Sequence, residues 1–403
     1  MVPETGSKLT GLYNPRGCSP LRTSLNFMII GAGLRMLWIA GPLVQCGWLL
    51  GFAIISLIGA LSAYLVLGMF YAYSDLRMEG ISLTPSYSGL CKQVLGDVLG
   101  LAAWFCFNAT VFGFQSATLV FAGSSLHEAT GLHERTSVLV LFLAMLPLIF
   151  VRTTSALSYV SLAGLTGSAM LMVTVVVAAI NRLSSEGPAD TFMNAFPMNG
   201  NGELALSQTV MVFNMAMGAV PQMGGMKDAK KFPVTVACTF SVLAVVYSFM
   251  AAIIFISWGE LVTGEINAMA VVLKEGVGYK LFVSIAVVVL SIAQYTSGIF
   301  GQGVSTDTIS KNRMVQILLR FILHTSQSCL AYFTCKDLGT LVNLVARVIV
   351  PFVALFFPAL IMISHSLKHK KKSILEMALL FSIVLSSLVL ASSGAYRSYQ
   401  KTV

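Results

Sequence analysis

The composition of this 403-residue chain is that of a protein embedded in a lipid bilayer. Hydrophobic residues make up 56% of the chain and charged residues only 10%, and its mean hydropathy is +0.83, far from the values of soluble globular proteins. The net charge of +9 is explained by basic loops on the inner face of a membrane, so no nucleic-acid partner is expected.

The first 22 residues form a polar segment ahead of the first apolar stretch. They contain no short apolar region followed by a small-residue cleavage site, so no removable signal peptide is predicted. Arg and Lys are about twice as frequent on the side of the membrane that holds this segment as on the other side. This bias predicts a cytoplasmic N-terminus in a multi-pass protein of the plasma membrane or of a vacuolar or other internal membrane.

The first apolar stretch, Ser24 to Gly47, has a Gly-Ala-Gly triplet at its centre. Each glycine weakens a helix by roughly 1 kcal/mol relative to Ala and exposes backbone polar groups. The triplet would lie inside the roughly 30 Å apolar slab, where bare peptide groups are tolerated only in protein or beside a cavity. It indicates either a broken transporter helix or a small-residue face for close helix packing.

Windows of about twenty apolar residues give eleven spans in total. The spans cover residues 24–46, 48–75, 99–123, 135–151, 156–181, 204–225, 233–257, 278–303, 314–334, 338–366 and 373–394. Residues 80–98 are too polar to cross and are expected to lie along the surface, and residues 182–203 read as an aqueous loop.

The sixth span is also interrupted about halfway, by Asn214, Gly218 and Pro221. Spans one and six stand five apart, as in two five-helix repeats of inverted topology that each open with a discontinuous helix. The expected organisation is an N-terminal segment 1–22, a ten-helix core 23–366 with repeats of about 23–181 and 204–366, and a part 367–403 with a basic loop, an eleventh helix and a short tail.

Three short motifs resemble the amino acid/auxin permease family, within the amino acid–polyamine–organocation group. The motifs are Asn26 to Gly33 with Gly47-Trp48, Ser86-Tyr87 with Gly96, and Phe213 to Phe232 with Met226-Lys227 and Lys231-Phe232. The resemblance implies an all-α polytopic membrane protein with a LeuT-type 5+5 inverted-repeat bundle plus an eleventh helix. It also implies secondary active transport of amino acids, by symport or a related mechanism. The chain departs from the family pattern at Arg35, Gly225 and Ala229.

The two helix breaks offer partners for both charged groups of an α-amino acid, its carboxylate and its ammonium. The helix restarting at Leu34 would offer first-turn N–H groups and a positive dipole end to a carboxylate. Carbonyls freed near Ile30 and Phe213 would accept the ammonium. Together with the roles that the resemblance implies, the predicted substrate-binding residues are Gly31, Ala32, Gly33, Leu34, Arg35, Phe213, Asn214 and Gly218. Asn108 and Gln115 would either contact the substrate or bond neighbouring helices.

Arg35 is placed near the middle of the membrane, where a cation costs about 2.5–3.5 kcal/mol on insertion scales. It is roughly 18–20 Å of helix from either end of its span, too far for its side chain to reach water. A wet cavity or a cluster of carbonyls is therefore needed. Arg35 would bind a substrate carboxylate or acidic side chain, replace a coupling cation, or form a salt bridge.

The coupling ion is expected to be Na⁺ or H⁺, with no other cofactor or metal. The resemblance implies a sodium site at the Ile30 carbonyl with the adjacent hydroxyls of Thr296 and Ser297, although such hydroxyls commonly bond their own helix. His324 is the one titratable group expected to be buried in the membrane as a candidate for proton coupling.

A transporter of this kind is expected to be a monomer in contact with membrane lipids. The alternatives to transport are a sensor or receptor, a membrane enzyme and a channel. A channel is not expected, because the sequence shows no pore-lining rings of repeated polar residues. A sensor or receptor would keep the fold and bind an amino acid without moving it. A membrane enzyme is not expected, because the chain has no H-E-x-x-H or G-x-S-x-G motif and the Gly31–Gly33 triplet lacks the third glycine of a dinucleotide site.

Overall fold

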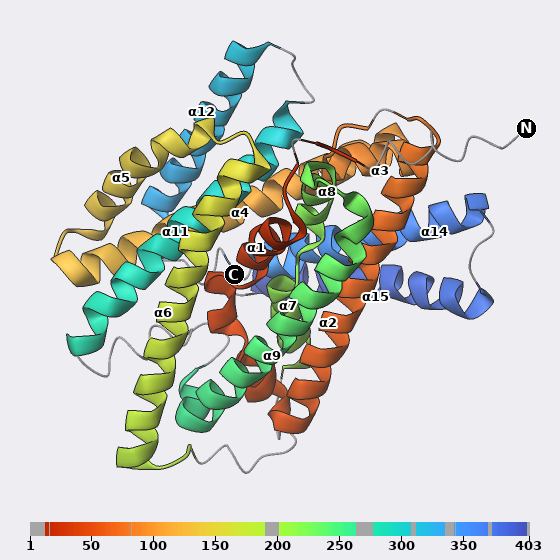
Figure 1. The fold of residues 1–403 in the computed structure, drawn as a ribbon. Coiled ribbons are helices and arrows are strands. Elements are labelled where there is room, and N and C mark those ends of the chain that lie inside the picture. Colours follow the sequence, from red (N-terminus) through yellow and green to blue (C-terminus); the bar gives the residue numbers. More distant parts are fainter. Residues whose placement is uncertain are drawn as a thin grey trace, which may run out of the picture.

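The protein is a bundle of helices, seen here in a computed structural model (Figure 1). The structure describes residues 13–15, 17–81, 83–189, 201–262, 277–307, 312–334, 342, 344–369 and 373–400. The first twelve residues of the predicted N-terminal segment, part of the predicted loop 182–203 and the basic residues 370–372 lie outside these ranges. Within the described residues every regular element is a helix.

Both regions predicted as repeats consist of helices in the described residues. The first repeat consists of α1 (Pro20–Gly31), η2 (Leu34–Trp38), α2 (Gly41–Met78), α3 (Tyr87–Leu95), α4 (Asp97–Thr130), α5 (Glu134–Met145), η3 (Leu146–Phe150) and α6 (Thr154–Glu186). The second consists of α7 (Gly202–Val212), α8 (Ala216–Gly225), η5 (Ala229–Lys231), α9 (Phe232–Trp258), η6 (Gly259–Leu261), α11 (Val277–Thr306), α12 (Arg313–Phe333), η7 (Val345–Ile349), η8 (Phe352–Phe356) and α14 (Phe357–His369). An additional helix, α15 (Ile374–Gln400), follows.

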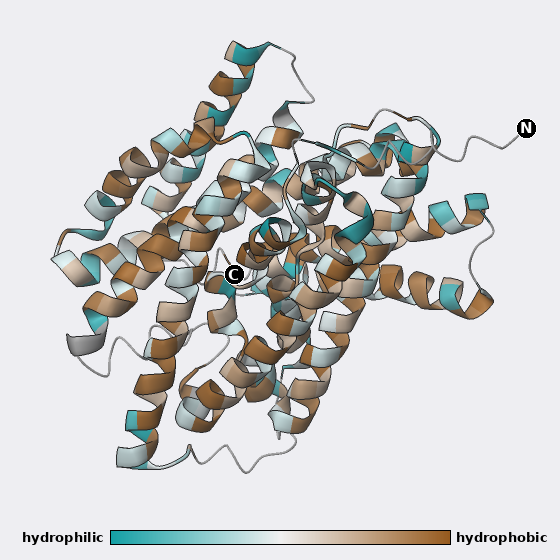
Figure 2. Cartoon of the chain, viewed as in Figure 1, coloured by the Kyte–Doolittle hydropathy of each residue, from teal (hydrophilic) through white to brown (hydrophobic). Residues whose placement is uncertain are grey.

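Eight helical segments among the described residues are long and apolar enough to cross a membrane. The other three predicted spans correspond to α1 with η2, to α5 with η3, and to α12, which are shorter, interrupted or more polar. Large apolar side chains such as Leu57 and Val245 stay exposed on the outer surface. Hydrophobic residues extend along the long helices and hydrophilic ones gather towards helix ends (Figure 2), as a lipid-facing surface requires.

Gly47 makes the turn between the first and second spans. It has a φ of 75°, a left-handed value that favours glycine, inside a helix that otherwise runs from Gly41 to Met78. The first span therefore ends here, and α2 continues as the second span. The predicted surface segment contains the short helix α3, which begins after its N-cap, Ser86.

The segment before α1 is tied to the end of α8 by backbone hydrogen bonds. Cys18 N–H donates to the Gly225 carbonyl and Lys227 N–H donates to the Cys18 carbonyl, both at 2.8 Å. Asn14 N–H donates to the Lys227 carbonyl at 2.9 Å. The two discontinuous helices are thus connected on this side of the bundle by main-chain contacts as well as by packing.

Gly164 of α6 permits the close packing of α6 on α11 beside the first break. A Cβ added at Gly164 would lie 2.2 Å from Cβ of Ala293 and 2.7 Å from Cδ1 of Ile29. The Ala293 Cβ is fixed to its backbone, so the helices would have to separate. Gly164 therefore sets the spacing of α6, α11 and α1.

We expect Gly164→Val to lower the midpoint of thermal unfolding in detergent, because overpacking a core costs about 1–3 kcal/mol. Ala293→Gly in the same chain should recover part of the loss, since it removes the contacted methyl group. Gly202→Val is the matched control, because no atom of the described residues lies within 4 Å of an added Cβ there. Equal unfolding midpoints for Gly164→Val and the parent would contradict this account of the packing.

Candidate functional site

Two interrupted helices meet near the centre of the bundle (Figure 1). Between α1 and η2 the helix is interrupted at Ala32 and Gly33, and between α7 and α8 at residues 213–215. The two interrupted helices touch, because a Cβ added at Gly218 of α8 would lie 2.2 Å from Cδ1 of Ile30. Pro221 lies inside α8 rather than in the interruption, and there it withholds a single N–H from the helix.

A cavity lies between these interrupted helices, α4 and α11. Its empty volume is about 830 Å³, and this figure includes the part of the cavity that is open to solvent. Of the residues predicted to bind substrate or ion, five line it: Ile30, Leu34, Arg35, Gly218 and Ser297. Six do not line it: Gly31, Ala32, Gly33, Phe213, Asn214 and Thr296.

The cavity wall is mainly apolar and aromatic, with a few polar groups. Trp38 of η2 and Phe121 of α4 contact each other with ring centroids 5.9 Å apart, and both line the cavity. The polar lining residues are Arg35, Gln115, Thr118, Gln294 and Ser297. Such a wall, apolar with a few directed polar groups, is typical of a small-molecule site.

Arg35 places its guanidinium between the two interrupted helices. Its Nη1 lies 3.5 Å from the carbonyl oxygens of Met211 and Asn214, at the break after α7. The Met211 carbonyl also accepts from the Asn214 N–H at 3.3 Å. Its Cζ lies 4.3 Å from the centroid of the Phe114 ring, a cation–π contact. Among the described residues no carboxylate pairs with Arg35, so the salt bridge weighed from the sequence is not formed with any of them.

Polar side chains from other helices cap the first interruption. The Leu34 N–H donates to Oε1 of Gln294 on α11 at 3.0 Å. The Ser168 hydroxyl on α6 donates to the Ala32 carbonyl at 2.5 Å. The sequence predicts that the Leu34 N–H binds a substrate carboxylate. In the structure this N–H is already bonded to Gln294. The sequence does not predict the roles of Gln294 and Ser168. The only indication in the sequence is that each is a polar residue within an apolar span.

The second interruption is held by short-range backbone bonds and by aromatic packing. Met215 N–H donates to the Phe213 carbonyl at 2.7 Å. The Phe213 ring stacks on Phe240 at 6.4 Å and meets Tyr247 edge-on at 5.1 Å, so it points away from the cavity. Asn214 is fully buried, and its Oδ1 has no hydrogen-bond partner among the described residues.

The hydroxyl and amide residues considered from the sequence divide between the cavity and helix packing. The Thr296 hydroxyl donates to its own helix at Ile292 O, 2.6 Å away, whereas Ser297 faces the cavity. Asn108 Nδ2 donates to the Ser305 hydroxyl and Gln115 Nε2 to the Tyr295 carbonyl, so both bond α4 to α11. Gln115 also lines the cavity, and its buried Oε1 has no partner among the described residues.

The other buried basic groups lie away from the cavity. Arg320 Nη2 is 3.2 Å from Asp307, and its Nη1 donates to the Ile149 and Val151 carbonyls. His324 bonds the Tyr295 hydroxyl through Nδ1 and the Phe142 carbonyl through Nε2. Arg347 lies in the π-helical turn η7, packed against Gly394 of α15.

Two interrupted helices around one cavity, in a helical bundle with an apolar surface, define the LeuT-type fold that the resemblance predicts. Two solved structures share this fold. MhsT in complex with L-phenylalanine is 12% identical, with a TM-score of 0.66 and coverage of 96% of this chain and 99% of that one. The Eremococcus coleocola manganese transporter, in complex with an aromatic bis-isothiourea substituted compound, is 13% identical, with a TM-score of 0.54 and coverage of 98% and 99%.

The chain belongs to the family described as transmembrane amino acid transporter protein, whose model matches residues 16–400. The membership confirms the family predicted from the motifs and an integral, multi-pass membrane protein. No curated protein matches the chain. The family and the fold are those of transporters rather than enzymes.

Proposed function

We propose that this protein is a secondary active transporter that moves an amino acid across a membrane by alternating access. The observation that carries the proposal is Arg35, a cation in a mainly apolar cavity between two interrupted helices, with no described carboxylate beside it. A buried charge of this kind is expensive to keep and marks a functional site by default. The family description supports an amino acid as the substrate.

The substrate carboxylate would bind Arg35, because the Leu34 N–H is already bonded to Gln294. Arg offers several N–H donors in a planar fork, so it can hold two helix carbonyls and a carboxylate together. The ammonium would bind Oε1 of Gln115, which lacks a described partner, and the Ser297 hydroxyl on the same wall. The apolar surface around Trp38 and Phe121 then suits a neutral amino acid with an apolar side chain.

The driving ion in this proposal is Na⁺ or H⁺. Sodium would bind where Ile30 and Ser297 meet the cavity wall, near the first interruption. Proton coupling would instead use His324, which is buried in the bundle next to Tyr295. The two alternatives differ in which gradient drives uptake, so one assay distinguishes them.

Purified protein in lipid vesicles should accumulate at least one radiolabelled neutral amino acid above the level of protein-free vesicles. The panel should include basic and acidic amino acids, and each should be tested under an inward Na⁺ gradient, an inward H⁺ gradient and neither. Stimulation by one gradient identifies the coupling ion. Saturable binding with no uptake under any gradient would refute transport and indicate a receptor.

A further inference from the structure

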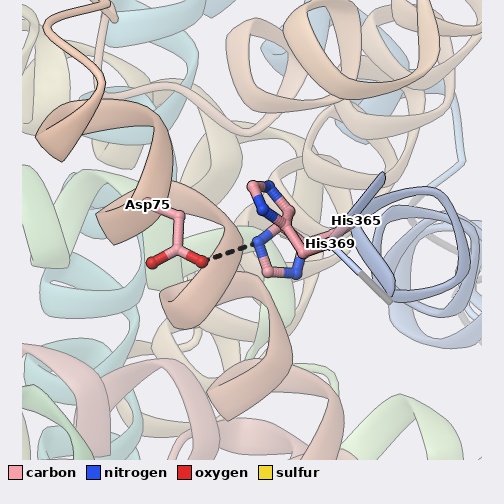
Figure 3. Close-up of side chains that lie close together, drawn as sticks. All are labelled: Asp75, His365 and His369. Atoms are coloured by element: carbon pink, nitrogen blue, oxygen red, sulfur yellow. Dashed lines mark hydrogen bonds and ion pairs between the residues drawn. The ribbon is translucent and has the colours of Figure 1, made fainter. Parts of the chain in front are cut away.

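A second group of charged residues lies where α2 and α14 end, apart from the central cavity. Asp75 lies in the last turn of α2 and Glu79 is the C-cap residue of that helix, four residues later. His365 and His369 lie one turn apart on α14. Both histidine side chains extend from α14 towards Asp75 (Figure 3). One ligand atom from each of Asp75, His365 and His369 lies within 4.8 Å of the other two.

The spacing of these atoms is close to that of a tetrahedral metal site. Bonds of 2.0–2.1 Å to nitrogen and oxygen ligands imply ligand atoms about 3.3 Å apart around Zn²⁺. Nε2 of His365 lies 3.0 Å from Oδ2 of Asp75, and Nε2 of His369 lies 3.8 Å from Oε1 of Glu79. The two imidazole centroids are 4.6 Å apart, so one ion can contact both rings after small rotations.

The helices that carry these groups are held together two turns earlier in the chain. A Cβ added at Gly68 of α2 would lie 2.2 Å from the sulfur of Met362 on α14. Asp75 follows Gly68 by seven residues and His369 follows Met362 by seven, so each ligand lies on the same helix face as the contact before it. The ligands are therefore positioned by packed helices rather than by loops.

Burial of the group also favours an ion. The side chains of Asp75, His365 and His369 are 18%, 12% and 22% exposed, so water competes only partly for them. Two carboxylates balance a divalent cation, and imidazole with carboxylate ligands suits Zn²⁺ among the common metals. Lys368 contacts the other carboxylate oxygen of Glu79 at 3.0 Å, which leaves Oε1 to face His369.

We propose that Asp75, His365 and His369 form a binding site for a divalent transition metal, best suited to Zn²⁺, with Glu79 as the fourth ligand. The ion joins α2, which continues from the first interrupted helix, to α14, the last helix of the second repeat. The site is separate from the central cavity, and its existence does not depend on the proposed transport activity.

Zn²⁺ affinity of the full-length protein in detergent, measured by competition with a chromogenic chelator, tests the proposal directly. Loss of groups that merely orient a metal ligand costs 10–100-fold in affinity, so removing ligands should cost about 100-fold or more. We expect this loss for the double variant His365→Ala/His369→Ala and for Asp75→Asn. The matched control is His127→Ala/His133→Ala, which removes two imidazoles that bond other groups between α4 and α5.

Two further readouts separate this site from other bound metal and from misfolding. Zn²⁺ should raise the unfolding midpoint of the parent and of the control variant, but not that of the double variant. Bound Co²⁺ should show the visible bands of a tetrahedral nitrogen and oxygen site, without a thiolate charge-transfer band. Unchanged affinity in the double variant, a thiolate band, or no stoichiometric binding would overturn the proposal and leave Asp75 and His365 as an ion pair only.

Discussion

Arg35→Met should reduce amino acid uptake in vesicles by about 10- to 150-fold, the equivalent of a hydrogen bond to a charged group worth about 1.5–3 kcal/mol. The loss follows because Arg35 is the only Arg or Lys among the described residues that line the cavity. Arg35→Lys should retain part of the activity with a raised KM, because it keeps the charge without the planar fork. Initial rates across substrate concentrations measure both effects.

The matched control is Arg22→Met, which removes an exposed guanidinium of α1, before the interruption, that bonds Ser155 and Tyr159. Its uptake should stay near that of the parent. Dependence of Arg35→Met on added Na⁺, where the parent shows none, would indicate that Arg35 replaces a coupling cation. Parent-like uptake by Arg35→Met would remove the basis of the proposed substrate site.

Gly33→Ala should also depress uptake strongly, because the added Cβ would lie 1.5 Å from Nε2 of Gln294. Gln294 must then move, and the Leu34 N–H loses its partner inside the membrane. An unsatisfied buried donor costs about 1–3 kcal/mol. If this cost destabilises the transport-competent state, uptake should fall by roughly 5- to 150-fold. Uptake and the unfolding midpoint of the same preparation would be measured together.

A double-mutant cycle provides the control for this prediction. Gln294→Ala should by itself remove the cap of Leu34 and lower uptake. Adding Gly33→Ala to it should cost little more, since the clashing amide is gone. Fully additive losses would mean that Gly33 and Gln294 act independently, contrary to the contact seen here.

The helix interruptions could be predicted from the sequence because local chemistry causes them. Gly31 and Gly33 weaken the first span, and the structure interrupts the helix at Ala32 and Gly33. The second interruption falls at residues 213–215, where the sequence suggested a wider region reaching Pro221. A proline in a helix costs one hydrogen bond, and neighbouring helices can compensate for that, so its presence alone does not locate a break.

The partners at the interruptions could not be predicted, because they come from distant spans. Gln294 reaches Leu34 across 260 residues, and a single glutamine in an apolar span is equally consistent with ordinary helix packing. The position of Phe213 at the break predicts that it lies beside the substrate. Its ring instead fills the space beside Gly59, between Phe240 and Tyr247, which only the packing of three helices determines.

The residues of the proposed metal site are also only partly predictable from the sequence. The spacing of Asp75 with Glu79, and of His365 with His369, is visible in the sequence and places each pair on one helix face. That α2 and α14 lie side by side depends on the tertiary fold. In the sequence, His369 reads as one member of a basic run at the membrane surface.

The main-chain bonds between residues 14–18 and 225–227 connect the ends of the two discontinuous helices. Any motion that opens the cavity towards this side must either carry α1 and α8 together or break three backbone hydrogen bonds. We therefore expect α1 and α8 to move together as one rigid unit at the start of such an opening. The barrier to exposing the substrate on this side would then be set partly by a short segment that never touches the substrate.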